Sequence, residues 1–381
     1  MRRHCRKRIF TLFFGCLIFY IGGYVFVSIS EVTRDSTEKI VYLHALRRSS
    51  PMEHNIELCS SNDIDLIIII ISSSSHFLER ESIRETWGSM PNLMNIRSQC
   101  IFVVGYQDGN SMFEELLNEA KSKHDLLYLT VDDDSIVGKE LHAYKWLEKY
   151  CSNVTFTFKT NDYFFVNTFL LHELIQELTT NPQQYQNRYL YNNSLESLFT
   201  AHINPGANKF LFGRMFQASR PHRDKLSPFY VSYKEYPKDL YPPYCSIFGY
   251  LMDSKTRNLL TEEGLKDKSP FRFSDVYITG ILPERLRFIC NNIPFTYHLG
   301  STDECINIIK KQNVESSRSP LIVCSTSLIP AYKFLDFYRI WTVLKHVYKN
   351  RMYSTQGVFL LYQNKNKETV LTLLRYLSTN I

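Results

Sequence analysis

Residues 157–167, with the sequence TFKTNDYFFVN, join a predicted buried strand to a predicted helix through a short polar turn. Apolar residues alternate from position 154 to 158, as in a strand, and recur at helical spacing from 169 to 178. Open α/β sheets bind ligands at the carboxyl ends of their inner strands, so the carboxylate of Asp162 in this turn is a candidate ligand-binding group. The alternative is an Asx-type turn that binds nothing.

Strands and helices alternate along the chain before this stretch. Short apolar runs predict strands at residues 65–71, 101–105 and 126–131, and helical patterns fall at 79–88, 113–120 and 139–151. This alternation predicts an α/β fold with a mostly parallel central sheet. Residues 157–167 then supply the fourth strand and the turn that follows it.

The segments beyond residue 209 are less regular. They predict strands at 210–216 and 229–233, an irregular loop rich in Pro and Tyr at 236–250, and an apolar run at 273–282 that carries Asp275 near its start. Aromatic faces pack on pyranose rings, so the loop could cover a sugar site. A plain surface connection would have the same composition.

The first 62 residues predict a membrane anchor followed by a spacer. Residues 1–8 are a basic tail, residues 9–29 are uncharged and long enough to span a bilayer, and residues 30–62 form a polar stem. The length of the apolar segment favours a retained signal anchor over a cleaved signal peptide. The basic flank predicts a cytosolic amino end and a single-pass type II protein. Residues 63–330 are then a luminal domain and residues 331–381 a helical extension.

The charge, the cysteines and the glycosylation sequons are consistent with a luminal location of the chain after residue 30. The net charge is +6, of which the tail supplies five, so nothing favours a nucleic-acid partner. Of nine cysteines, seven follow residue 30 without the spacing of a zinc site; we expect some to form disulfides and at least one to be left over. Asn153 and Asn192 begin glycosylation sequons, and Asn192 is expected to be the more accessible.

Two further clusters carry charge near predicted strand ends. Arg80 and Arg84 lie four residues apart on one predicted helix and could hold a diphosphate, the alternative being ion pairs with neighbouring glutamates. Asp132, Asp133 and Asp134 follow the third strand and suggest a metal site. The alternative is an exposed turn whose negative charge favours the start of the next helix.

Six collinear segments resemble the β-1,3-galactosyltransferase family, type II Golgi glycosyltransferases that include β-1,3-N-acetylglucosaminyltransferases and, more distantly, the Fringe proteins. The segments are ERESIRETWG, IFVVG, the Trp-x4-Cys of residues 146–151, KTNDYFFVN, YPPYCSIFGY and SDVYITGIL. The resemblance covers roughly residues 65–292. It implies a GT-A-like nucleotide-sugar-binding fold, a UDP-sugar donor, a glycan acceptor, Mn²⁺ and inversion at the anomeric carbon.

The resemblance also implies roles for particular residues. An inverting transfer needs a carboxylate that takes the proton of the attacking hydroxyl, and the match assigns this role to Asp275. Departure of a nucleoside diphosphate needs a cation, and the match assigns the metal to Asp162, with Asp132, Asp133 and Asp134 as the fallback. The implied donor-binding residues are Arg80, Arg84, Lys159, Asn161 and Asp162, and the implied acceptor-binding residues are Tyr244 and Tyr250.

The acidic motif departs from the family pattern. Asn161 and Tyr163 replace its outer carboxylates, and Ser274 replaces the glutamate before Asp275. An amide oxygen is a weak ligand for Mn²⁺, and a phenol with a pKa of about 10 is a poor one. Two hypotheses therefore stay open. One is a hexosyltransferase that moves galactose or N-acetylglucosamine into a β-1,3 linkage, and the other is a catalytically silent Golgi protein that binds glycans or assists an active transferase.

Overall fold

The computed structural model describes Cys59 and residues 64–89, 92–93, 96–106, 110–180, 209–293, 296–312, 321–325 and 330–353. The predicted anchor, nearly all of the predicted stem and the sequon at Asn192 lie outside these residues. In the described part, no helix combines the length and the apolar character that crossing a membrane requires. The predicted type II topology therefore stays a prediction.

Four parallel strands form one half of the central sheet. In spatial order they are β4 (Leu126–Asp132), β3 (Ile96–Tyr106), β1 (Leu66–Ile71) and β5 (Phe156–Asn161). Every side chain of β1 is buried, because helices cover both faces of the sheet. These strands confirm the predicted mostly parallel sheet and its four predicted strands.

The other half of the sheet mixes directions. Here β8 (Tyr244–Asp253) runs antiparallel to β5 and to β7 (Leu211–Phe216), and β9 (Asn291–Asn292) pairs with β7. In the first half, the short β2 (Asn92–Leu93) pairs antiparallel with β3. The prediction of an irregular loop at 236–250 is wrong for its second half, because from Tyr244 onward the backbone pairs with two neighbouring strands. The strand predicted at 229–233 is also wrong, since that segment lies in a loop with an isolated bridge between His222 and Tyr230.

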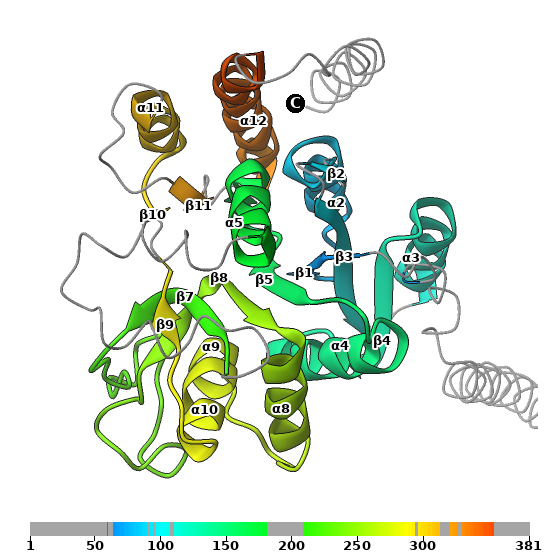
Figure 1. Cartoon of the computed structure of the whole chain (residues 1–381). Coiled ribbons are helices and arrows are strands. Elements are labelled where there is room, and N and C mark those ends of the chain that lie inside the picture. Colours follow the sequence, from blue (N-terminus) through cyan, green and yellow to red (C-terminus); the bar gives the residue numbers. More distant parts are fainter. Residues whose placement is uncertain are drawn as a thin grey trace, which may run out of the picture.

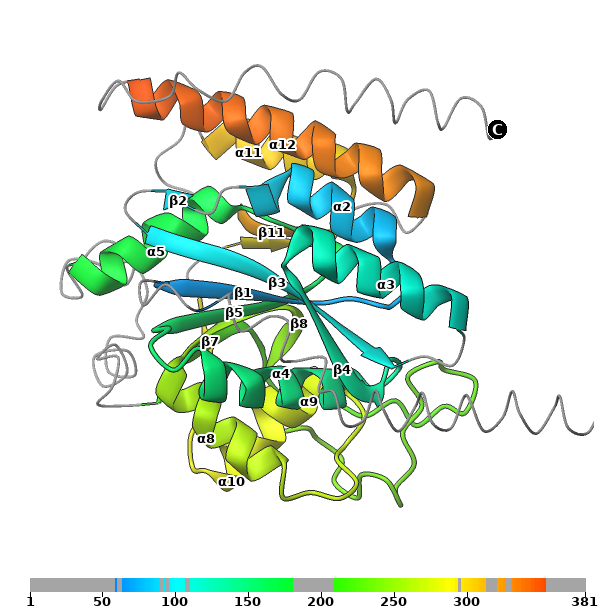
Figure 2. The ribbon, with the colours of Figure 1, turned by 90° about the vertical axis from the view of Figure 1, so that its right-hand side faces the viewer.

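Two layers of helices enclose the sheet (Figures 1 and 2). One face carries α2 (Phe77–Glu85), α5 (Thr168–Thr180) and α12 (Pro330–Tyr353), with α3 (Asn110–Lys123) and α11 (Thr302–Gln312) beside them. The opposite face carries α4 (Ile136–Tyr150), α8 (Ser254–Gly264), α9 (Ser274–Val276) and α10 (Leu282–Arg285). A small second sheet joins β6 (Phe164–Val166), β11 (Leu321–Ser325) and β10 (Thr296–His298).

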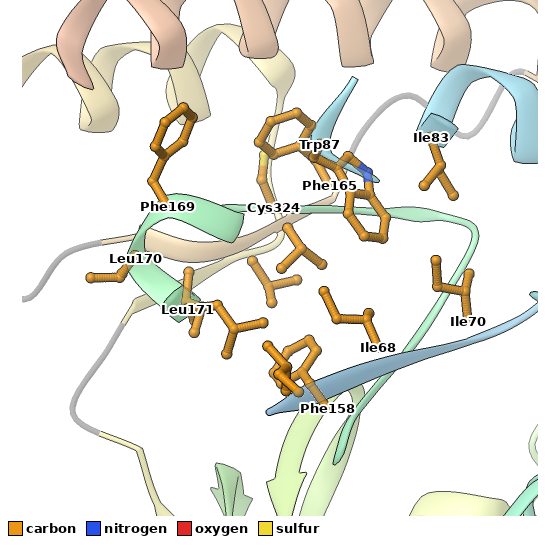
Figure 3. Close-up of a cluster of buried hydrophobic side chains, with 14 of the residues drawn as sticks. Ile68, Ile70, Ile83, Trp87, Phe158, Phe165, Phe169, Leu170, Leu171 and Cys324 are labelled. Carbon is orange, nitrogen blue, oxygen red and sulfur yellow. The ribbon is translucent and has the colours of Figure 1, made fainter. Parts of the chain in front are cut away.

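The helix α12 belongs to the same core as the central sheet. In Figure 3, Phe169 of α5 and Phe165 of β6 lie above Ile68 and Phe158 of the sheet, with α12 beyond them. The ring of Phe169 stacks on Tyr348 of α12 with centroids 4.5 Å apart. The segment predicted as an extension from residue 331 therefore closes the apolar layer over β1 and β5.

Three disulfides tie the elements together. They join Cys59 to Cys151, Cys245 to Cys290 and Cys305 to Cys324, and within the described residues Cys100 is the cysteine without a disulfide. This confirms that some of the seven cysteines pair and that one is left over. The first disulfide holds the chain before β1 against the end of α4.

Candidate active site

The polar turn after β5 lies where the parallel strands end. Ile71, the last residue of β1, is the register partner of Asn161, and the amide of Asp162 donates to the carbonyl of Ile71 at 3.2 Å. The loop after β1 leads into α2, and the end of β4 leads into the turn before α4. The turn therefore lies at the carboxyl ends of inner strands, as the sequence predicts.

Asp162 is held by a histidine that the sequence did not single out. The carboxylate is 1% exposed, and its Oδ2 accepts a hydrogen bond from Nδ1 of His76 at 2.9 Å. His76 directly precedes α2, and its ring meets the ring of Tyr163 edge-on with centroids 5.5 Å apart. Among the described residues, Oδ1 of Asp162 has no hydrogen-bond partner. One of the two carboxylate oxygens of Asp162 is thus bonded within the protein.

The residues around Asp162 do not fit the Mn²⁺ site that the family resemblance implies. Burial, together with the nearby charge of Asp162, raises the pKa of Tyr163 to about 12, so its phenol stays neutral. Asn161 offers a single amide oxygen, which has no hydrogen-bond partner in the described part of the chain. Across the ranges that the structure describes, no three His, Cys, Asp or Glu side chains group as metal ligands would.

The fallback metal residues serve the fold instead. Asp133 accepts hydrogen bonds from the amides of Ser74 and Gly105, both at 2.8 Å, and from Nζ of Lys139 at 3.1 Å. These donors occupy both carboxylate oxygens and join the loop after β1 to β3 and α4. Asp132 accepts from the amide of Asp134, whose own side chain is exposed. The contacts favour the alternative of a structural turn over a metal site.

Replacing Asp133 by asparagine is expected to destabilise the protein by about 3 kcal/mol, because it leaves the buried ammonium of Lys139 without a counter-charge. Burial alone would raise the pKa of Asp133, but the amides of Ser74 and Gly105 hold it below its ordinary value of 3.8. A lowered pKa contributes stability above the ordinary pKa that is lost as pH falls through the folded value. Between pH 7 and pH 3, the unfolding temperature of Asp133→Asn should therefore fall by less than that of the wild type. The matched control is Asp134→Asn, which should behave as wild type.

Arg80 and Arg84 are engaged by carboxylates of their own chain. Arg80 is fully buried and pairs with Glu119 at 2.7 Å, and it also donates to the carbonyl of Ser73 at 2.6 Å. Arg84 pairs with Asp125 and Glu119, both at 2.7 Å. These contacts join α2 to α3 and to the turn before β4. They favour a structural role for both arginines over the predicted contact with a diphosphate.

Lys159 belongs to a buried polar network between β5 and α4. Its ammonium lies 3.3 Å from Oε2 of Glu140, and both side chains are fully buried. Oε1 of Glu140 accepts from the hydroxyl of Tyr144 at 3.0 Å and from that of Tyr250. Glu140 was missed by sequence reasoning, although its place one turn before Tyr144 on a predicted helix was a usable signal. The predicted donor-binding role of Lys159 stays a prediction.

Asp275 lies beside this network at the start of α9. Burial raises the pKa of its carboxyl above the ordinary value, against the amide of Val276 and the positive charge of Lys159, which lower it. The amide of Val276 donates to Oδ1 of Asp275 at 2.9 Å and fixes the side chain. After α9 the chain continues as the π-helical turn η3 (Tyr277–Ile281), a distortion often found at functional sites.

The two tyrosines predicted to bind the acceptor differ. Tyr250 faces inward, its hydroxyl bonds Glu140, and it is fully buried, so the acceptor prediction is wrong for this residue. Strand alternation in β8 turned it toward α4. Tyr244 is half-buried, and burial together with the charge of Asp275 raises the pKa of its phenol. Its predicted acceptor-binding role stays a prediction. Asn153 is exposed after α4. Because Asn192 lies outside the described residues, the expectation that Asn192 is the more accessible of the two stays a prediction.

Comparison with known proteins finds relatives among the galactosyltransferases. The family model described as Galactosyltransferase matches residues 78–293, more than half of the chain. The chain is similar to β-1,3-galactosyltransferase 1 of Homo sapiens, at 26% identity over 222 residues, which is 58% of this chain and 60% of the relative. It is also similar to β-1,3-galactosyltransferase 5 of Mus musculus, at 25% identity over 223 residues, covering 58% of this chain and 63% of that protein.

A third relative is β-1,3-galactosyltransferase 4 of Rattus norvegicus, 26% identical over 221 residues, or 56% of this chain and 58% of the relative. The match thus spans about three fifths of the length of these relatives. A solved glycosyltransferase involved in the glycosylation of the major capsid of PBCV-1 is 10% identical with a TM-score of 0.29, which is too low to support an argument. On the strength of the family model, this chain belongs to the galactosyltransferase family.

Proposed function

We propose that the protein is an inverting hexosyltransferase with Asp275 as its general base. It would move galactose or N-acetylglucosamine from a UDP-sugar to a glycan on protein or lipid, in β-1,3 linkage. The observation that carries the proposal is a carboxylate of raised pKa, fixed by a backbone amide at the start of α9 beside the polar edge of the sheet. Family membership supports the reaction class.

The transfer would proceed as a single displacement. The acceptor hydroxyl oxygen forms a bond to the anomeric carbon while the bond from that carbon to the diphosphate oxygen breaks. The hydroxyl proton passes to the carboxylate of Asp275, and the electron pair of the broken bond leaves with UDP. Because burial raises the pKa of Asp275, its carboxylate is a stronger base than an exposed aspartate.

No step of this mechanism is assigned to a metal, because the described residues do not fit a Mn²⁺ site. We therefore expect UDP to bind with an affinity that changes less than about twofold between excess EDTA and millimolar Mn²⁺, since one buried carboxylate already bonded to His76 adds little metal affinity. Isothermal titration calorimetry of the full chain in detergent measures this directly. Binding that appears only with Mn²⁺ would restore the family's metal to the site.

A silent glycan-binding or chaperone-like protein is the second candidate. The observation that favours it is that the cations predicted to hold the diphosphate each face a carboxylate of the chain: Arg80 and Arg84 contact Glu119, and Lys159 contacts Glu140. A screen of UDP-sugars with and without EDTA separates the two candidates. Sugar transfer rules out the silent protein, whereas absence of both transfer and UDP binding rules out the enzyme.

We further propose that the protein acts in the lumen of the Golgi, anchored by residues 9–29. The three disulfides support an oxidising compartment, and the exposed sequon at Asn153 supports access to the glycosylation machinery. In sealed vesicles, an epitope at the carboxyl end should resist added protease. Digestion of that epitope without detergent would contradict the proposed orientation.

A further inference from the structure

The segment from residue 217 to 243, called here the aromatic loop, covers the helix that carries Asp275. Tyr236 and Tyr241 of the loop form a buried apolar cluster with Val276, against which Phe271 and Phe273 pack. The ring centroids of Tyr241 and Phe271 are 5.8 Å apart. The position of α9, and with it the position of the candidate base, therefore depends on this loop.

Two arginines, one from the aromatic loop and one from the chain before α9, hold the backbone of the loop in place. Arg223 donates to the carbonyl oxygens of Val231 at 2.8 Å, Tyr236 at 2.9 Å and Lys238 at 2.8 Å. Arg272, just before α9, donates to the carbonyl of Tyr230 and pairs with Glu235 at 2.9 Å. These bonds fix the loop from inside and from the side of α9.

Two large rings nevertheless point out of this well-held loop. Phe229 is 56% exposed and Tyr233 is 59% exposed. Exposing a phenyl ring to water is unfavourable, and a backbone fixed by several hydrogen bonds gives that ring little freedom to turn inward. Exposed aromatic rings that are held in place are typical of a surface that binds a ligand.

The exposed ring of Phe229 lies on the side of the candidate base. The ring centroid of Phe229 is 6.3 Å from that of Phe273, and Phe273 is the residue that caps α9, two positions before Asp275. Sequence reasoning missed both rings, because it predicted residues 229–233 as a strand. The link of Phe229 to the base through Phe273 is visible only in the folded chain.

We propose that Phe229 and Tyr233 form a platform on which a pyranose ring of the glycan acceptor packs, next to Asp275. The inference rests on the proposed function and names its acceptor site. A sugar presents apolar C–H groups on one face and hydroxyl groups at its edge, so it suits aromatic rings with polar neighbours. Charged groups also contact Tyr233: the guanidinium of Arg223 stacks over one face of the ring, 3.9 Å from its centroid, and Asp239 accepts from the hydroxyl at 3.2 Å. The other face of the ring is the one open to a sugar.

These charged groups argue for a sugar over a lipid surface. Pressing the rings into a bilayer would bring Arg223 and Asp239 to the hydrocarbon boundary, where charged side chains are unfavourable. Hydroxyl groups of a sugar can instead exchange hydrogen bonds with them. Arg223 and Asp239 therefore make the platform suited to a polar ligand with hydroxyl groups.

Binding of glycans to the full chain in detergent tests the platform without requiring catalysis. The probe is an array of immobilised oligosaccharides ending in β-galactose or β-N-acetylglucosamine. We expect Phe229→Ala and Tyr233→Ala each to weaken binding about tenfold, and Phe229→Trp to restore it, with UDP affinity unchanged. Leu226→Ala is the matched control, because Leu226 is 92% exposed on the same loop but offers no ring. If transfer is observed, the KM for the acceptor should rise and that for the donor should not.

The outcomes separate this inference from the proposed function. Glycan binding that both alanine variants retain, or that the wild type lacks, overturns the platform even if transfer occurs. Ring-dependent glycan binding without transfer from any UDP-sugar supports the platform and contradicts the enzyme.

Discussion

Asp275→Asn is expected to reduce sugar transfer by a factor of about 10² to 10⁴ while leaving the fold intact. An asparagine oxygen can still accept the hydrogen bond from the amide of Val276, so the backbone of α9 stays in place. What is lost is the only role a neutral amide cannot perform, which is to take the proton of the attacking hydroxyl. Transfer from a UDP-sugar to a glycan acceptor, measured with the full chain, provides the rate.

The stability of the same variant supplies the control. Burial raises the pKa of Asp275, so the charged form is disfavoured in the folded protein, and its contribution to stability is lost as pH rises through the folded pKa. At neutral pH the asparagine variant should therefore be as stable as the wild type or more stable. For the enzyme, the rate should fall as pH drops through that raised pKa. Asp303→Asn, on the exposed side of α11, should change neither quantity. Full activity in Asp275→Asn would remove the base from the mechanism.

Lys159→Met is expected to destabilise the protein by about 3 to 5 kcal/mol, because it leaves the fully buried carboxylate of Glu140 without its cation. Glu140→Gln should have a similar effect through the unpaired ammonium. The double variant should recover much of the loss, since two neutral side chains of similar size need no counter-charge. Chemical unfolding followed by tryptophan fluorescence measures all three free energies.

The control for this pair is an exposed lysine of α4. Lys145 pairs with Glu148 at 2.8 Å, but Lys145 is exposed and Glu148 is partly exposed, so Lys145→Met should change stability by less than about 0.5 kcal/mol. If the two single variants of the buried pair lie within about 1 kcal/mol of wild type, water must reach the network. If the effects of the single variants simply add in the double variant, Lys159 and Glu140 act independently.

Much of the fold could be predicted because its strands are continuous apolar runs. β1 is five isoleucines after a leucine, and such a run needs cover on both faces, which a parallel sheet between helices provides. The place of the candidate site followed from the same pattern, since the polar turn at Asp162 ends one of these strands. Strands and turns whose structure depends on neighbouring residues could therefore be predicted from the sequence.

The roles of charged and aromatic residues could not be predicted in this way, because their partners are distant in sequence. Arg84 meets Asp125, which lies 41 residues further along, and the network of Glu140 includes Tyr250, 110 residues away. Whether a guanidinium group contacts a carboxylate or a ligand depends on such pairings. Tyr250 illustrates the same limit, since its direction is set by the register of β8 on β5.

The position of α12 means that the core over β1 can be completed only late in translation. The ribosome makes β1 and α2 early, yet the helix that packs against α2 and the layer above β1 is among the last described segments of the chain. Until α12 emerges, α2 and α5 cover that apolar layer only in part, so the amino-terminal half needs protection from aggregation during translation. A stop codon at position 330 should therefore give a product that is retained by chaperones and degraded. A secreted, protease-resistant product would show that the sheet closes without it.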